Sequence, residues 1–538
     1  MLSSSTWVPR GFASEFPVQY ELDDEEMERI NKLAQLEIND AKQELAEEEE
    51  ETTSSNKLTD QFEVDDDLKE YDLEHYDDDE DEDDGARVSM LPGLSNDAEY
   101  HENEDGEDPY ISLPNQDEVV QDKKESQVYP TDNLILSTRT EDDISYLDIH
   151  VYDDGADEFA DPEVPTGHER PNALYVHHDL MLPAFPLCVE WINFRPNNAE
   201  NDVGNFAAVG TFDPQIEIWN LDCIDKAFPD IILGEPSNHP SLKKKKNKKS
   251  KHITTHHIDA ILSLSHNKYH RNILASTSAD STIKLWDLNT ASAARSLNQI
   301  HQGKNVSSSQ WHQTESSILL TGGYDSRVAI SDVRIAQDSE MSKYWNALGD
   351  VENVKWINET QFLAGNDQGG VYCFDIRQES KPLWTLQAHD AGISSLEVNP
   401  YVSEMLVTAA MGEKVVKLWK MPTEEGKGPS MVLSRDFGVG NVLTTSFAPD
   451  LEVAGNLVVG GVNKGLKMFD FFSNKAVRTN FKDQLKAVQQ KARDEAKAQG
   501  KVDSRIARKY QGDYSETMLQ VEDDDGEDED DEDEEVEE

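Results

Sequence analysis

Short stretches in which apolar and polar residues alternate recur through the middle of the chain, usually in pairs joined by a tight polar turn. The segments NILASTSADSTIKLWD at 272–287 and SILLTGGYDSRVAISD at 317–332 show this pattern most clearly. Alternation over about six to eight positions indicates a β-strand, and small residues with Asp between two such runs indicate a hairpin. Similar pairs begin near residues 134, 205, 404 and 455. The chain is therefore predicted to be all-β.

The hairpins are regularly spaced along the chain. They close at Trp219, Trp286, Ser331, Phe374, Trp419 and Phe469, and the last four intervals are 45, 43, 45 and 50 residues. The first interval, 67 residues, contains a lysine-rich insertion, and an earlier unit closes on Tyr152, again 67 residues before Trp219. A period of about 45 residues is that of a four-stranded propeller blade. We expect a seven-bladed β-propeller over 128–481, with a lysine-rich loop at 237–255.

With this period the units resemble those of the WD-repeat family. In that family a His, a turn Asp and a Trp form a hydrogen-bonded structural network inside each blade. The matching residues here are His256, His257, Asp280, Trp286, Asp213, Trp219, Asp325, His389 and Trp419. Other units depart from the pattern: Ser331 replaces the aromatic, Glu413 and Asn463 take the turn position, and the first unit lacks the His.

A ring of such sheets leaves no exposed edge strand if it closes. The segment near 475–481 follows the last hairpin directly. We expect it to form an outer strand that pairs with N-terminal strands of the first unit and locks the ring.

Charge is concentrated at the two ends of the 538-residue chain, whose formal net charge is −60. Residues 1–130 carry 42 acidic and 9 basic side chains, and residues 521–538 carry 15 acidic and no basic ones. Such segments bury too little apolar surface to offset chain entropy. We therefore expect a largely disordered acidic extension over 1–127, a basic helical extension over 482–511 and an acidic disordered tail over 512–538.

The sequence disfavours several classes of function. It has no run of about 18 apolar residues that would span a membrane, and its N-terminus does not resemble a secretion signal. Three widely separated cysteines predict no disulfide framework. No phosphate-binding loop, nucleophile elbow or metal-ligand spacing is present. We expect no catalytic residue, no cofactor, no metal and no small-molecule substrate.

Seven segments are similar to those of the periodic tryptophan protein 1 family. They are WVPRGF at 7–12, DPYISLPN from 108, YVHHDLMLPAFPLCVEW from 175, GTFDPQIEIWNLD from 210, KAFPDIILGE from 226, GPSMVLSRDF from 428 and SRIARKY from 504. The resemblance implies a nucleolar, non-enzymatic WD-repeat factor that assembles the large ribosomal subunit and acts in pre-ribosomal RNA processing. Its implied partners are those of the pre-ribosomal particle: ribosomal RNA, large-subunit ribosomal proteins and other assembly factors.

A lysine run lies inside the predicted loop at 237–255. Its bases are Lys243, Lys244, Lys245, Lys246, Lys248, Lys249 and Lys251. The run is typical of a nuclear import signal or of a patch that contacts RNA phosphates, and one segment can do both. The alternative is a solvated run of charge without a partner.

The segment 481–510 has helical composition. Leu485, Val488, Ala492 and Ala496 form a narrow apolar stripe at spacings of three and four, and bases dominate the remainder. We expect this helix to leave the propeller and dock on RNA or a ribosomal protein; the alternative is a helix packed on the propeller's side, or a frayed one. Arg505, Arg508 and Lys509, which alternate with apolar residues, are candidate RNA or protein contacts.

The N-terminal region contains apolar residues in acidic surroundings. Trp7 and Phe12 are interpreted as anchors for a partner, with packing onto the protein's own propeller as the alternative. The segment 22–51 has near-helical spacing of apolar residues, typical of a segment that folds on a partner. The acidic runs could attract basic clients or serve only solubility.

Two other classes of function stay open. One is a chromatin or histone-binding propeller that uses its acidic tails. The other is a substrate receptor of a ubiquitin ligase, since SDVR at 331–334 and FDIR at 374–377 loosely match a W-D-x-R signature, although both lack its Trp.

Overall fold

The computed structural model describes most of the chain outside the charged segments. The described residues are 1–20, 27, 99–101, 110–112, 123–124, 126–155, 172–196, 202–234, 252–336, 338–378, 381–424, 426–463, 465–498, 506 and 517–521. The chain divides into two compact units, residues 1–20 with 126–538, and residues 21–125. In the second unit, β3 (Glu99–His101) pairs antiparallel with β4 (Tyr110–Ser112).

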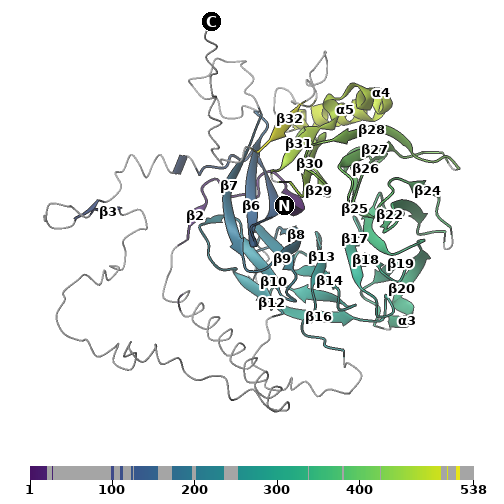
Figure 1. Cartoon of the computed structure of the whole chain (residues 1–538), viewed down its shortest axis with the longest axis horizontal. Helices are drawn as coiled ribbons and strands as arrows, with labels where there is room; N and C mark the ends of the chain where they lie inside the picture. The colour runs from purple at the N-terminus through teal and green to yellow at the C-terminus, as the bar shows by residue number, and fades with distance from the viewer. Residues whose placement is uncertain are drawn as a thin grey trace, which may run out of the picture. The chain divides into compact units, whose positions relative to one another are not determined.

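The first unit is a seven-bladed β-propeller, which confirms the predicted fold (Figure 1). The first three blades, each given from the inner strand outward, are β1 (Leu2–Val8), β5 (Asn133–Glu141), β6 (Ile144–Asp153), β7 (Ala173–Leu182); β8 (Pro186–Ile192), β9 (Phe206–Thr211), β10 (Ile216–Asn220), β12 (Ile231–Leu233); and β13 (Ile261–His266), β14 (Ile273–Ser278), β15 (Ile283–Asp287), β16 (Ser292–Leu297).

The remaining four blades follow in chain order. They are β17 (Val306–Trp311), β18 (Ile318–Gly323), β19 (Arg327–Asp332), β20 (Ser342–Asn346); β21 (Val351–Trp356), β22 (Gln361–Asn366), β23 (Gly370–Asp375), β24 (Trp384–Gln387); β25 (Ile393–Val398), β26 (Met405–Ala410), β27 (Val415–Lys420), β28 (Ser430–Asp436); and β29 (Val442–Phe447), β30 (Asn456–Gly461), β31 (Lys467–Asp470), β32 (Met518–Gln520). The helical elements are α3 (Asp338–Met341), η3 (Leu451–Val453), η4 (Phe471–Ser473), α4 (Lys475–Asn480) and α5 (Lys482–Ala498).

The seven inner strands contact one another in a closed cycle. Each of β8, β13, β17, β21, β25 and β29 lies against the next, and β1 lies against both β8 and β29. The first strand of the chain therefore sits between the second blade and the last. This contact brings together residues more than four hundred positions apart and closes the ring.

The predicted means of ring closure is wrong in its details. Residues Lys475–Asn480 form the helix α4 instead of an outer strand, because the Asn474 side chain caps it by accepting hydrogen bonds from the backbone N–H groups of Ala476 and Val477. The outer strand of the last blade is β32, which comes from the expected acidic tail and pairs with β31. Residues 1–20 and 517–521 thus belong to the propeller unit, beyond the predicted 128–481.

The N-terminal segment continues past β1 along the first two blades. After β1, the short strand β2 (Val18–Gln19) pairs in parallel with β11 (Cys223–Ile224), which follows the third strand of the second blade. The backbone N–H of Val128 also donates to the Glu15 carbonyl. The first twenty residues are therefore fastened to the propeller at several points.

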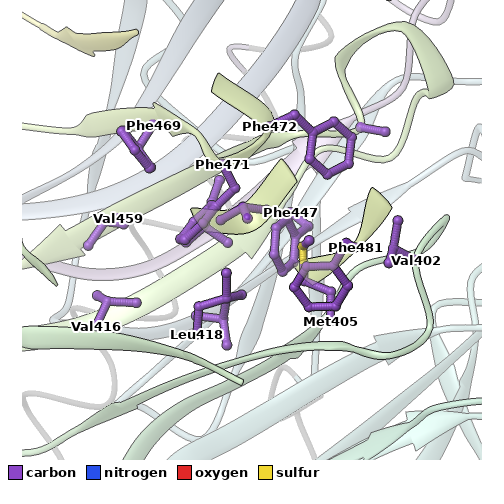
Figure 2. Packing of buried hydrophobic residues seen from close by; sticks show 14 of the residues in the cluster. Val402, Met405, Val416, Leu418, Phe447, Val459, Phe469, Phe471, Phe472 and Phe481 are labelled. Atoms are coloured by element: carbon purple, nitrogen blue, oxygen red, sulfur yellow. The ribbon is translucent and has the colours of Figure 1, made fainter. Parts of the chain in front are cut away.

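Aromatic residues fill the core of the last blade. Phe447, Phe469, Phe471, Phe472 and Phe481 pack together with apolar side chains of the sixth blade (Figure 2). Burial of each large apolar side chain stabilises a fold by roughly 1.5–3 kcal/mol. Val488, Ala492 and Ile506 belong to the same cluster, so the end of the propeller and the C-terminal helix share one core.

No helix in the described residues is long and apolar enough to span a membrane.

Candidate functional site

The third blade holds the complete predicted network. His257 Nδ1 lies 2.9 Å from Asp280 Oδ2, its Nε2 lies 2.7 Å from Ser276 Oγ, and Trp286 Nε1 donates to the same Ser276 oxygen at 2.8 Å. Burial lowers the pKa of His257, so the ring is mostly neutral at pH 7 and donates from Nδ1 to the carboxylate. Burial alone would raise the pKa of Asp280, but the hydrogen bonds from His257 and Thr282 outweigh it and lower that pKa to about 2.

The neighbouring His256 takes no part in this network. Its Nδ1 lies 2.9 Å from Thr255 Oγ1, at the surface. The two adjacent histidines differ in this way because only His257, which is fully buried, points into the blade. The structure therefore resolves the predicted pair in favour of His257.

Two further blades carry the same arrangement. In the fourth, His301 Nδ1 lies 2.9 Å from Asp325 Oδ1 and its Nε2 lies 2.9 Å from Thr321 Oγ1. In the sixth, His389 Nδ1 lies 2.6 Å from Glu413 Oε2, so the longer Glu replaces the usual Asp without loss of the hydrogen bond. Trp419 Nε1 completes this network by donating to Thr408 Oγ1 at 2.9 Å.

The prediction missed His301, although its spacing was a usable signal. His301 precedes its turn carboxylate by 24 residues, as His389 does, and His257 precedes Asp280 by 23. The His301 network has no Trp, because Ser331 stands at the position that Trp286 and Trp419 take in their blades. The Ser331 hydroxyl lies 2.7 Å from Ser342 Oγ instead.

The second blade departs from the predicted network. Asp213 lies exposed in its turn, where its backbone N–H donates to Thr211 Oγ1. Trp219 Nε1 donates instead to Glu217 Oε2 at 3.1 Å. Asp213 is therefore a turn residue and not a partner of Trp219, and the prediction for it is corrected. The buried members of these networks hold the strands of their blades together.

Trp7 and Phe12 pack on the protein's own propeller, so their interpretation as partner anchors is corrected in favour of the alternative. Trp7 is 5% exposed in β1, its Nε1 donates to the Ser446 carbonyl, and its ring meets Tyr152 edge-on. Phe12 lies edge-on to Trp191 with ring centroids 4.7 Å apart. Both residues are held there because β1 supplies the inner strand of the first blade.

Arg10, between these two aromatics, joins the first blade to the last. Its Nη2 pairs with Asp154 at 2.7 Å and its Nε donates to Asn133 Oδ1 at 2.8 Å. Asn133 Nδ2 in turn donates to Asp450 Oδ2 at 2.6 Å, and the same oxygen accepts from the Arg10 backbone N–H. The WVPRGF motif therefore closes the ring.

The C-terminal helix α5 packs against the propeller and does not leave it. Val488, Ala492 and Ala496, three of the four residues of the predicted apolar stripe, are buried, and Leu485 packs against the same core. Gln484 Nε2 donates to Glu404 at 2.7 Å, and the Lys491 ammonium lies 5.1 Å from the centre of the Tyr401 ring. The expected docking helix is thus part of the propeller's side.

A pocket of about 130 Å³ lies where α4, η4 and α5 meet. Its apolar surface comes from Phe472, Leu485, Val488 and Ile506, and its charged side chains are Arg478, Lys482 and Lys486. Gln489, the remaining lining residue, donates from Nε2 to the Ile506 carbonyl. Among the described residues, the lining contains three bases and no carboxylate. We refer to these eight residues as the α5 pocket.

Some predicted contacts lie outside the described residues. These are the seven bases of the 243–251 run, the bases Arg505, Arg508 and Lys509, the segment 22–51 apart from Met27, and the acidic runs. The chain after the lysine run is fixed in place: the Lys284 ammonium donates to the Ile253 carbonyl and to Ser296 Oγ, both at 2.7 Å. Burial lowers the pKa of Lys284 to about 8.

The described part of the chain shows neither a metal site nor a reactive cysteine thiolate. No group of His, Cys, Asp or Glu side chains there could hold a metal ion. Burial raises the pKa values of the Cys188 and Cys373 thiols to about 12, so neither is a reactive thiolate.

Comparison with known proteins agrees with this architecture. The model of the WD domain, G-beta repeat family matches residues 248–287, which include the first three strands of the third blade. Periodic tryptophan protein 1 of Saccharomyces cerevisiae is 60% identical over 97% of each chain. This chain belongs to the periodic tryptophan protein 1 family.

Two further relatives are less similar to this chain. The homolog from Drosophila melanogaster is 30% identical over 82% of this chain and 88% of its own. An uncharacterized WD repeat-containing protein of Schizosaccharomyces pombe is 39% identical over 90% of this chain and 92% of its own. The similarity therefore extends well beyond the single blade that the family model matches.

Proposed function

We propose that this protein is a non-enzymatic nucleolar factor that assembles the large ribosomal subunit and acts in pre-ribosomal RNA processing. The observation that carries the proposal is the similarity to periodic tryptophan protein 1 over 97% of each chain. The role itself is what the resemblance of the sequence motifs to that family implies. In this role the propeller is a scaffold for ribosomal RNA, ribosomal proteins and other assembly factors.

The distribution of charge supports this proposal. The chain has a net charge of −60, yet α4 and α5 carry seven bases and three acids between residues 475 and 498. A basic surface segregated from acidic ends can attract a polyanion that the chain as a whole repels. The rigid ring would hold that surface in a fixed position, and several modest contacts on one scaffold would add to tight association.

Depletion of the protein in cells tests the proposal. We expect precursors of the large-subunit RNAs to accumulate and free large subunits to fall, while small-subunit precursors change little. Gradient sedimentation should place the tagged protein with particles that contain large-subunit precursor RNA. Normal levels of every precursor after depletion would reject the proposal.

The chromatin-binding alternative makes an opposite prediction in nuclear extracts. A factor bound to precursor RNA should be released by RNase and retained after DNase, whereas a histone-binding propeller should behave in the reverse way. Release by DNase alone would favour the chromatin function.

A further inference from the structure

We infer that the α5 pocket and the basic stripe beside it form a binding site for single-stranded polynucleotide, with one base held in the pocket and the adjoining phosphates on the stripe. This inference deepens the proposed function and rests on it for one point, that the strand is RNA.

The first observation is the chemistry of the pocket. Its lining combines four apolar side chains with three cations, so its ligand combines an uncharged flat or apolar group with negative charge. Lys482 and Lys486 are exposed, and neither makes an ion pair with any described residue. At about 130 Å³ the pocket is smaller than typical small-molecule sites of roughly 300–1,000 Å³. It suits one group of a larger ligand.

The second observation is the continuation of charge along α5. Lys482, Lys486, Gln489, Arg493 and Lys497 recur at intervals of four, three, four and four residues. On a helix of 3.6 residues per turn these positions lie on one side. We call these five residues the basic stripe; it runs for about 22 Å and includes no acid.

The acids of α5 lie away from this stripe. Asp483 and Asp494 lie about 80° and 100° around the helix from the centre of the stripe, on its flank, and Glu495, which pairs with Lys491, lies on the opposite side. The ligand must therefore carry repeated negative charges that continue beyond the pocket.

A single strand of nucleic acid meets both requirements. It bears one phosphate for each nucleotide, and its unstacked bases are free to enter an apolar pocket. A duplex offers the phosphates but keeps its bases paired and stacked inside. An acidic peptide also offers repeated negative charge. A single-stranded polynucleotide offers in addition a flat base for the pocket beside each phosphate.

The site differs from the one that the sequence predicts. The apolar stripe of α5 faces the propeller, so the helix binds through the adjoining polar side. Arg478 and Phe472 come from α4 and η4, which precede α5, and Ile506 follows it. The Arg478 Nη1 group is fixed by donating to the Ser473 carbonyl at 3.0 Å, so it is already positioned at the pocket.

The test measures binding of the purified full chain to a fluorescein-labelled 12-nucleotide oligouridylate by anisotropy. In Lys482→Gln/Lys486→Gln we expect about tenfold weaker binding at 0.1 M salt, and a salt slope that is shallower by about 1.4. The matched control, Lys304→Gln/Lys414→Gln, removes the same charge from exposed loops of other blades and should bind as the wild type does. Equal binding by the α5 double variant overturns the inference.

A second variant tests the pocket itself. Leu485→Trp fills the pocket, so it should abolish the preference for oligouridylate over an abasic strand of equal length, a preference of about five- to a hundredfold in the wild type. Its salt slope should stay unchanged. If Leu485→Trp lowers the melting temperature, Leu485→Phe replaces it in the test, because its smaller ring occupies the pocket with less disturbance of the fold. A preference that survives in a folded variant shows that no base enters the pocket.

Three other probes identify the ligand. Binding of a 12-base-pair RNA duplex as tight as that of the single strand would overturn the inference, and so would equal, lysine-dependent binding of a 12-residue polyglutamate. Oligothymidylate that binds more tightly than oligouridylate would assign the site to DNA. These outcomes are independent of the proposed function, because normal precursor RNA after depletion would reject that function whatever the purified protein binds.

Discussion

Single buried charged residues in this propeller have pKa values far from their usual range. Burial raises the pKa of Glu217 to about 7, the nearby charge of Asp213 adds to the rise, and the hydrogen bond from Trp219 opposes it. Between about pH 4.5 and 7 the folded protein keeps a proton that the unfolded chain releases. Stability therefore falls by about 1.4 kcal/mol per pH unit through that window and levels off above it.

The variant Glu217→Gln should remove this pH dependence. Gln stays neutral and can still accept from Trp219 Nε1, so the variant should be more stable than the wild type by about 1–3 kcal/mol at pH 8 and nearly equal to it at pH 5. Thermal unfolding at the two pH values measures the difference. Glu359→Gln, at an exposed position, is the control and should change neither. A gain of the same size at both pH values would show that Glu217 is ionised throughout.

Among the elements, β1 and α5 differ most from what the sequence predicts. Trp7 lies in β1 with its ring against Tyr152 and its Nε1 on the Ser446 carbonyl. Trp7→Ala should destabilise the protein by about 3–5 kcal/mol, because it leaves a cavity at the joint between the first and last blades. Phe16→Ala, in the same segment but 47% exposed, should have little effect. An unchanged melting temperature for Trp7→Ala would restore its interpretation as a partner anchor.

Features that depend on contacts between residues near in sequence could be predicted, whereas features that depend on distant contacts could not. Seven blades and the His257, Asp280 and Trp286 network could be predicted, because hairpins and fixed spacings are local signals. The inner position of β1 could not, since its sequence LSSSTWV alternates weakly and its partners are distant. Nor could β32, a three-residue strand beside an acidic run.

Helices show the same limit. The helix over 482–498 and its apolar stripe follow from the sequence, but the packing of that stripe on the propeller itself depends on residues distant in the chain, such as Phe472 and Tyr401. The α5 pocket draws its lining from three separate elements. The basic side chains of this segment can be recognised from the sequence. The pocket that we infer to hold a nucleobase cannot, because it forms only where α5 packs against η4.

In the molecule as a whole, one polar junction joins the first blade to the last. Asp450 accepts hydrogen bonds from Asn133 Nδ2 and from the Arg10 backbone N–H, and Asn133 is fully buried. Asp450→Ala should cost about 1–3 kcal/mol, because it leaves the buried Asn133 amide without this acceptor.

The loss should be local to that junction. Hydrogen exchange should rise in β1 and β29 before it rises in β13 or β17, because the ring opens where its ends meet. Asp390→Ala, at an exposed carboxylate, is the control. A uniform rise in exchange over all blades would contradict a special role for this junction.

The position of β1 also sets the order of events during translation. Ser5 Oγ lies 2.9 Å from Thr444 Oγ1, and 439 residues separate the two. At roughly 5–20 residues per second, a ribosome needs about 20–90 s to synthesise the chain between them. Throughout that time the nascent first blade exposes the apolar surface that the seventh will cover. Strand β1 is therefore translated before the other described strands and is among the last to be enclosed.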